Sequence, residues 1–161
     1  MDEGSSRAPA DAVSVSDEQH HPLDVGRLRR LAGFVLEAQD VPPGAELSVV
    51  CATSERMRDL NSRHMGEDRP TDVLAFPIDD SGRGAFGEPG LLGDVVLCPA
   101  VAAEQAARRE RPVDDELDLL LVHGILHLLG HDHAVPAERD AMFALTDRLL
   151  AGFAAPGKGR R

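Results

Sequence analysis

Four of the seven histidines in the chain lie in one short segment that runs from His123 to His133. On a helix, which turns by about 100° per residue, His123 and His127 lie one turn apart on the same face, so both imidazoles can reach one metal ion. His133 would face elsewhere if the helix continued. Gly130, however, is the residue type that ends a helix in the left-handed conformation and turns the chain back. The spacing therefore predicts a metal centre with His123, His127 and His133 as ligands.

The three imidazoles favour zinc, at one ion per chain, and they leave the fourth tetrahedral position to water, as in catalytic zinc sites. Neither of the two cysteines lies in this segment to complete a closed structural site. His131 and Asp132 lie between the expected ligands, and we predict that they contact substrate or hold a ligand imidazole. Beyond the water, the spacing identifies no catalytic group.

The histidine spacing equals that of the zinc-protease signature H-E-x-x-H-x-x-G-x-x-H. In those enzymes the glutamate activates water for attack on an amide, but position 124 of this chain is glycine. A zinc metalloprotease is therefore the weaker alternative. The motif is still compatible with cleavage of phosphodiester bonds, because a metal ion can also polarise a phosphoryl oxygen.

The surrounding sequence predicts an α+β domain with a single mixed sheet of three to four strands, about five helices over it, and the zinc site at the end of a central helix. We expect strands over residues 46–51, 73–76 and 95–98, and helices over residues 23–39, 53–61, 99–109, 114–129 and 136–150. Residues 1–22 are predicted to be a disordered acidic extension, residues 23–153 a single domain, and residues 154–161 a basic tail.

Charge and composition limit the partners. The 161 residues include 28 acidic and 17 basic side chains, for a net charge of −11. This charge does not exclude RNA, but it excludes broad tracking of phosphates and predicts weak, salt-sensitive binding to naked RNA. With no Trp or Tyr and five Phe, no aromatic platform for base stacking is expected. Apolar segments are too short to span a membrane, and the acidic first residues do not indicate an export signal, so we expect a cytoplasmic protein.

Three segments in chain order carry a family resemblance: LNSRHMGEDRPTDVLAFP, LGDVVLC and HGILHLLGHDH. Together, over about residues 46–150, the chain resembles the YbeY family of bacterial metal-dependent endoribonucleases. The resemblance implies zinc held by His123, His127 and His133. It implies cleavage of single-stranded RNA, notably near the 3′ end of small-subunit ribosomal RNA, in ribosome assembly and quality control. The implied partners are ribosomal RNA and the small ribosomal subunit, with ribosomal proteins or an assembly GTPase as further candidates, and neither membrane nor DNA.

The chain departs from the family pattern at two positions. Met65 stands where the family usually has an arginine that meets substrate phosphate, and His131 stands where it often has tyrosine. Arg63 or Arg69 of the same loop are candidates to supply the missing charge. Asn61 is a candidate for a hydrogen bond within that loop, or equally for the end of the preceding helix. Because of Met65, a ribosome-assembly factor that does not cleave RNA and holds a structural zinc ion is the second functional hypothesis.

Overall fold

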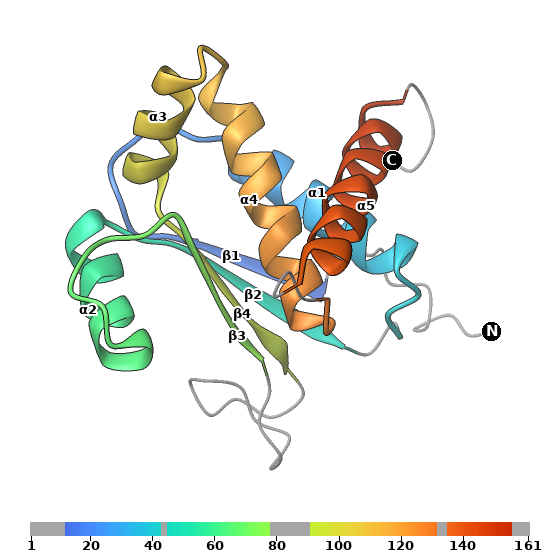
Figure 1. Ribbon diagram of the computed structural model, residues 1–161, viewed down its shortest axis with the longest axis horizontal. Coiled ribbons are helices and arrows are strands. Elements are labelled where there is room, and N and C mark those ends of the chain that lie inside the picture. The colour runs from blue at the N-terminus through green and yellow to red at the C-terminus, as the bar shows by residue number, and fades with distance from the viewer. Residues whose placement is uncertain (1–11, 43–44, 78–90, 132–134, 156–161) are drawn as a thin grey trace.

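The computed structural model describes residues 12–42, 45–77, 91–131 and 135–155. The elements in chain order are β1 (Val13–Asp17), α1 (Val25–Ala38), β2 (Glu46–Cys51), α2 (Ser54–Met65), β3 (Val73–Pro77), β4 (Leu91–Leu97), α3 (Pro99–Arg108), α4 (Val113–Leu128) and α5 (Pro136–Ala154). The strands form one sheet in the order β1-β2-β4-β3 (Figure 1). β1, β2 and β4 are parallel, and β3 runs antiparallel to β4 at the edge. The predicted α+β fold with one mixed sheet is confirmed.

The strand β1 corrects the sequence prediction, which assigns residues 13–17 to a disordered extension. These residues pair in parallel with β2, from Val13 opposite Leu47 to Asp17 opposite Cys51. Serine and aspartate lower the hydrophobicity of the segment, but alternation places Val13 in the core, where only 3% of it is exposed. The rest of the predicted extension, residues 1–11, and most of the predicted basic tail, residues 156–161, lie outside the described residues.

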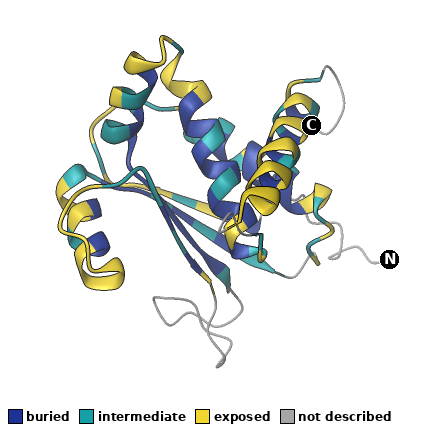
Figure 2. Ribbon diagram, in the orientation of Figure 1, coloured by how far each residue is buried: buried dark blue, intermediate teal, exposed yellow. Residues whose placement is uncertain are grey.

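Helices cover both faces of the sheet. α1, α4 and α5 share one large buried cluster with residues of β2 and β4, and α2 covers the opposite face with a smaller cluster (Figures 1 and 2). Along β4, Val95 and Leu97 belong to the large cluster, whereas Val96 and the next residue after the strand, Cys98, belong to the smaller one. This period of two is what a strand buried on both faces requires.

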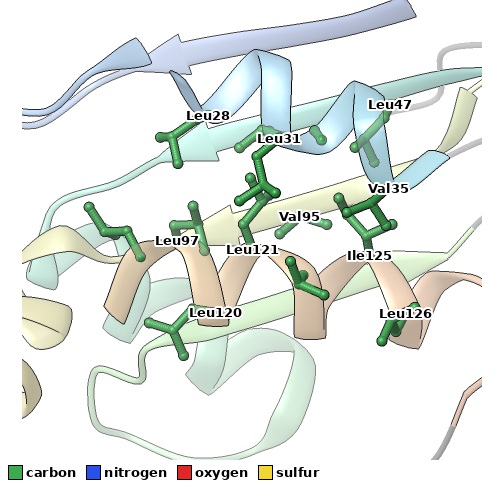
Figure 3. Packing of buried hydrophobic residues seen from close by; sticks show 14 of the residues in the cluster. Leu28, Leu31, Val35, Leu47, Val95, Leu97, Leu120, Leu121, Ile125 and Leu126 are labelled. Carbon is green, nitrogen blue, oxygen red and sulfur yellow. The ribbon is translucent and has the colours of Figure 1, made fainter. Parts of the chain in front are cut away.

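The central helix is α4, as predicted. It contacts the sheet and lies between α1, α3 and α5. Its Leu121 and Ile125 side chains are fully buried close to Leu31 and Val35 of α1 (Figure 3). Because α4 has buried residues around most of its circumference, the histidines at its end rest on a rigid support.

Two helices end later than the sequence indicates. α2 continues past the predicted end at Asn61 to Met65, because Gly66, with a φ of 74°, supplies the left-handed residue that ends it. Arg63 therefore lies on the helix, not in the following loop. α5 continues to Ala154. No helix in the described part of the chain is long and apolar enough to cross a membrane.

Candidate metal centre

The C-terminal end of α4 has the predicted glycine turn. Gly130 has a φ of 97°, and its N–H donates to the carbonyl of His127 at 3.1 Å. The N–H of His131 donates to the carbonyl of Leu126 at 3.0 Å. These two bonds and the left-handed glycine make a Schellman motif, which satisfies the last carbonyls of the helix and reverses the chain. The helix therefore ends just before Gly130, as its position in the sequence predicts.

His123 and His127 line one cavity of about 400 Å³ between α4 and the edge strand β3. His123 is half-buried and His127 is exposed, so one imidazole lies in the wall and the other at the opening. The remaining lining comes from the end of α2, from β3, from α4 and from α5, and consists of Met65, Asp72, Val73, Leu74, Ala75, Leu120, Gly124 and Met142. The cavity has the size of a small-ligand site.

Gly124 lets α4 approach the sheet. A Cβ atom at this position would stand 2.7 Å from Cγ1 of Val95 and 3.2 Å from Cγ2 of Val73, and the first distance is shorter than side-chain carbons tolerate. Gly124 lines the cavity, but a side chain at this position would point at Val95 and Val73 of the sheet. The absent protease glutamate has a structural reason, because α4 could not lie this close to β4 with any side chain there.

The ring of His123 packs on Phe143 of α5. Their centroids are 5.3 Å apart and their planes are inclined by 31°. A half-buried imidazole held by an aromatic ring has fewer rotamers available, so this contact orients His123 along the cavity wall. Phe143 also brings α5 into the site, which the sequence analysis did not anticipate.

Two imidazole nitrogens on one wall of a cavity suit zinc, so the donor set fits the predicted metal. The described residues contain no group of three His, Cys, Asp or Glu side chains arranged to hold a metal ion. The third predicted ligand, His133, and its neighbour Asp132 lie outside the described residues. The ligand set of His123, His127 and His133 therefore stays a prediction.

Comparison with known proteins shows the family of the chain. The sequence model of the family described as Endoribonuclease YbeY matches residues 14–154. The chain belongs to the YbeY family. The Endoribonuclease YbeY of Thermobifida fusca is 53% identical over 145 residues, which cover 88% of this chain and 94% of that protein. That of Salinispora tropica is 47% identical over 150 residues, covering 88% and 96%. The solution structure of TM1509 from Thermotoga maritima shares the fold, with a TM-score of 0.58 at 22% identity over 91% of this chain and 99% of that chain.

Met65 occupies the rim of the cavity in this YbeY-family chain, with half of its surface exposed. The two arginines proposed to replace the missing family arginine do not line the cavity. Arg63 pairs with Asp59 at 3.2 Å, and Arg69 pairs with Glu67 at 2.7 Å. Neither lines the cavity, and no lysine or arginine is among the described residues that do. The structure therefore brings no cation from this segment to the cavity.

Asn61 lies on α2 and makes its hydrogen bond to the loop that follows the helix. Its side-chain Nδ2 donates to the carbonyl of Arg69 at 2.8 Å, and the residue is only 3% exposed. Asn61 thus ties the segment between α2 and β3 to α2. His131 contributes its backbone to the Schellman turn and is half-buried.

Asp72 and Asp94 lie on opposite faces of the sheet. Asp72 lines the cavity, and its carboxylate accepts from the N–H of Val73 at 2.7 Å and from Nε2 of Gln105 at 3.2 Å. Asp94 is fully buried on β4 opposite Phe76, and alternation with Val95 places it on the α2 face. Only Asp72 can therefore reach a ligand in the cavity.

Phe143 is the site residue that sequence reasoning missed. The buried positions of α5 are Met142, Thr146, Leu149 and Phe153, and Phe143 lies off this stripe with 46% of its surface exposed. The sequence did contain a signal for Phe143, because an aromatic residue that lies beside the apolar stripe of a helix indicates a contact outside the core.

Proposed function

We propose that the chain is a zinc-dependent endoribonuclease that cleaves single-stranded RNA in the maturation of ribosomal RNA. In this proposal it acts in the cytoplasm near the 3′ end of small-subunit ribosomal RNA and takes part in ribosome assembly and quality control. Membership of the Endoribonuclease YbeY family supports the RNA-cleaving activity. The observation that carries the proposal is the placement of His123 and His127 on one wall of a cavity at a glycine-terminated helix end.

In this proposal His123, His127 and His133 hold the zinc ion. When bound, zinc supplies a water of pKa about 7 as nucleophile and stabilises charge on a phosphoryl oxygen. The fold of the chain places the ligand histidines. Gly124 brings α4 against β4, and Phe143 holds the ring of His123 in the cavity wall.

The other lining residues set the environment of the reaction. Leu120, Val73 and Met142 form an apolar wall beside the imidazoles. Such a wall excludes water and strengthens electrostatic interactions with the substrate phosphate. Asp72 adds a carboxylate at the boundary of the cavity, held in place by its bonds to Val73 and Gln105.

Weak electrostatic attraction is part of the proposal. The net charge is −11, and the described lining residues of the cavity include no lysine or arginine. Naked RNA is therefore expected to bind weakly, with affinity falling as salt rises. We propose that ribosomal RNA within the small subunit, with ribosomal proteins or an assembly GTPase, supplies the contacts that the cavity lacks.

The packing at position 124 is a further argument against the protease alternative. A glutamate at position 124 would collide with Val95, so the helix geometry that presents the two histidines leaves no place for the protease base. No other described lining residue occupies a corresponding position on α4.

Cleavage of a single-stranded fragment of ribosomal RNA tests the proposal. Zinc-loaded wild type should cut it, and His127→Ala should be slower by a factor of at least about 100, since loss of a metal ligand removes the nucleophile. His64→Ala, on α2 against Phe76, is the control and should cut normally. Equal rates for wild type and His127→Ala would refute the enzyme.

The assembly-factor hypothesis is favoured by Met65 at the cavity rim, where the family arginine is missing. It predicts that folded His123→Ala still binds small ribosomal subunits and that wild type cleaves no RNA. The enzyme hypothesis predicts cleavage that is lost in the same variant. Met65→Arg adds a cation at the rim and should strengthen RNA binding under either hypothesis, but it should increase cleavage only in an enzyme.

A further inference from the structure

A second cavity adjoins the first. It has a volume of about 390 Å³, and the two cavities share Asp72, Leu120 and His123 in their walls. We call it the α4–α5 cavity; its other lining residues are Arg109, Glu116, Leu119, Phe143, Thr146 and Asp147. A ligand at the two histidines can therefore extend past His123 into a space between α4 and α5 of the size of a small-ligand site.

Phe143 gives this cavity an exposed aromatic wall. Nearly half of the residue (46%) is open to solvent although its ring also contacts His123. An unpaired nucleobase can stack on such a ring, which is worth about 1–3 kcal/mol per base. The sequence-based expectation that the chain offers no stacking platform is therefore incomplete, because one well-placed phenylalanine suffices for a single base.

The charges in the cavity favour a base over a phosphate. Glu116 is fully buried and its carboxylate is bound by Arg109 at 3.1 Å, so this arginine is already engaged. The carboxylate of Asp72 is bound by Val73 and Gln105. The excess of carboxylates over cations repels a phosphate, whereas the neutral face of a base carries no such penalty.

Asp147 supplies a hydrogen-bond acceptor for that base. It lies four residues after Phe143, hence on the same face of α5, and it is exposed. It makes neither a hydrogen bond nor an ion pair with any other described residue. A carboxylate accepts from the exocyclic amino group of cytosine, adenine or guanine, which uracil lacks.

We propose that the α4–α5 cavity binds one unpaired nucleobase of the RNA substrate, stacked on Phe143 and selected for an exocyclic amino group by Asp147. The inference rests on the proposed function, because it is the RNA at the two histidines that extends into the cavity. It gives a structural reason for single-strand specificity, since a base in a duplex cannot reach the ring. It also assigns a base preference at one position of the cleavage site.

The chain allows a clean spectroscopic test, because it contains no Trp and no Tyr. In Phe143→Trp the single tryptophan reports on the cavity. Metal-free protein is titrated at low salt with single-stranded oligoadenylate, and stacking should quench the fluorescence by about half or more. Val113→Trp, which is exposed at the start of α4 and lines neither cavity, should not be quenched. Absence of quenching in Phe143→Trp would overturn the stacking role.

The affinity of Phe143 variants for single-stranded RNA distinguishes stacking on the ring from a merely structural role of Phe143. Phe143→Ala should weaken oligoadenylate binding about 5- to 150-fold. Phe143→Leu should be similarly weak, whereas Phe143→Tyr should bind close to wild type. Full affinity in Phe143→Leu would contradict the inference. Wild type should bind oligocytidylate or oligoadenylate at least about fivefold more tightly than oligouridylate, and Asp147→Asn should remove this preference. The control Glu104→Gln, an exposed acid on α3 outside both cavities, should keep it.

The outcomes distinguish this inference from the proposed function. RNA cleavage by wild type, without quenching and without an effect of Phe143→Ala on affinity, would leave the enzyme standing and refute the base site. Quenching with the predicted base preference, without cleavage by zinc-loaded wild type, would support the base site and refute the enzyme.

Discussion

Gly124 of α4 faces Val95 of β4 so closely that a Cβ atom on the glycine would stand 2.7 Å from Cγ1 of the valine. The valine is fully buried and its backbone is part of the paired strand, so it has little room to move. This contact sets how near the helix that carries His123 and His127 lies to the sheet. It links the packing of the core directly to the geometry of the candidate metal centre.

Gly124→Ala should therefore lower the free energy of unfolding by about 1–3 kcal/mol, the usual cost of an added methyl group in a full core. Gly26→Ala is the matched control on α1, where the nearest side-chain atom that a Cβ would meet is the flexible end of Arg30 at 3.3 Å. That substitution should be neutral or stabilise by up to about 1 kcal/mol. Urea unfolding of both variants measures the difference, and equal stability would show that α4 can shift at no cost.

The turn at Gly130 should matter for the metal as well as for stability. With a φ of 97°, Gly130→Ala is strained and should lose about 1–2 kcal/mol of stability. Gly66→Ala, with a φ of 74° at the end of α2, should lose a similar amount. Only Gly130→Ala should also weaken zinc binding, because its turn leads to His133. Calorimetric zinc titration separates the two variants, and an equal zinc affinity in both would contradict this role of the turn.

The ion pair between Arg27 and Asp118 should stabilise the contact between α1 and α4. Both guanidinium nitrogens Nε and Nη2 contact the carboxylate, and Asp118 is only 5% exposed. The pair raises the pKa of Arg27, chiefly through its hydrogen bond to Asp118. Arg27→Ala leaves a buried carboxylate without this partner and should cost about 1–3 kcal/mol.

Arg58→Ala is the matched control for that substitution. Arg58 contacts Asp68 through the same two types of nitrogen, at 2.8 and 3.2 Å, but both side chains are exposed. Water replaces such a partner, so the variant should unfold close to wild type. A loss of stability in Arg58→Ala as large as in Arg27→Ala would show that burial does not decide the strength of these pairs.

Stability should fall in alkaline solution through Cys51. Burial, with smaller contributions from Asp17 and Glu18, raises the pKa of this thiol from 9.0 to about 12. Above pH 9 the unfolded thiol ionises while the folded one stays protonated, so unfolding releases a proton and becomes easier as the pH rises toward 12. The free energy of unfolding, measured between about pH 8 and pH 11, should decrease in wild type and decrease less in Cys51→Ala. Parallel curves would contradict the assignment.

Much of the fold was predictable because local signals and burial agree. The β-branched run at residues 46–51 and the short apolar run at residues 73–76 form the expected strands, and Gly130 ends α4 as its position predicts. Backbone conformation at a glycine and the period of apolar residues are local properties, so the sequence shows them directly.

The remainder depends on contacts between distant segments. β1 is too polar to stand out, and it exists because pairing with β2 and burial of Val13 stabilise it. Phe143 belongs to the site only because α5 crosses α4 beside His123. Contacts of this kind leave no periodic signal. The arginines are a different case, because Arg63 and Arg69 pair with Asp59 and Glu67, four and two residues away, and these local pairs could be anticipated from the sequence.

The most direct test of the metal-dependent enzyme is a zinc titration of the metal-free chain with cleavage of single-stranded ribosomal RNA as the readout. We predict no cleavage without metal, a rise proportional to added zinc, and a plateau at about one zinc ion per chain. His127→Ala should remain inactive over the same range. Cleavage that is independent of zinc, or that reaches the same plateau in His127→Ala, would contradict the central claim.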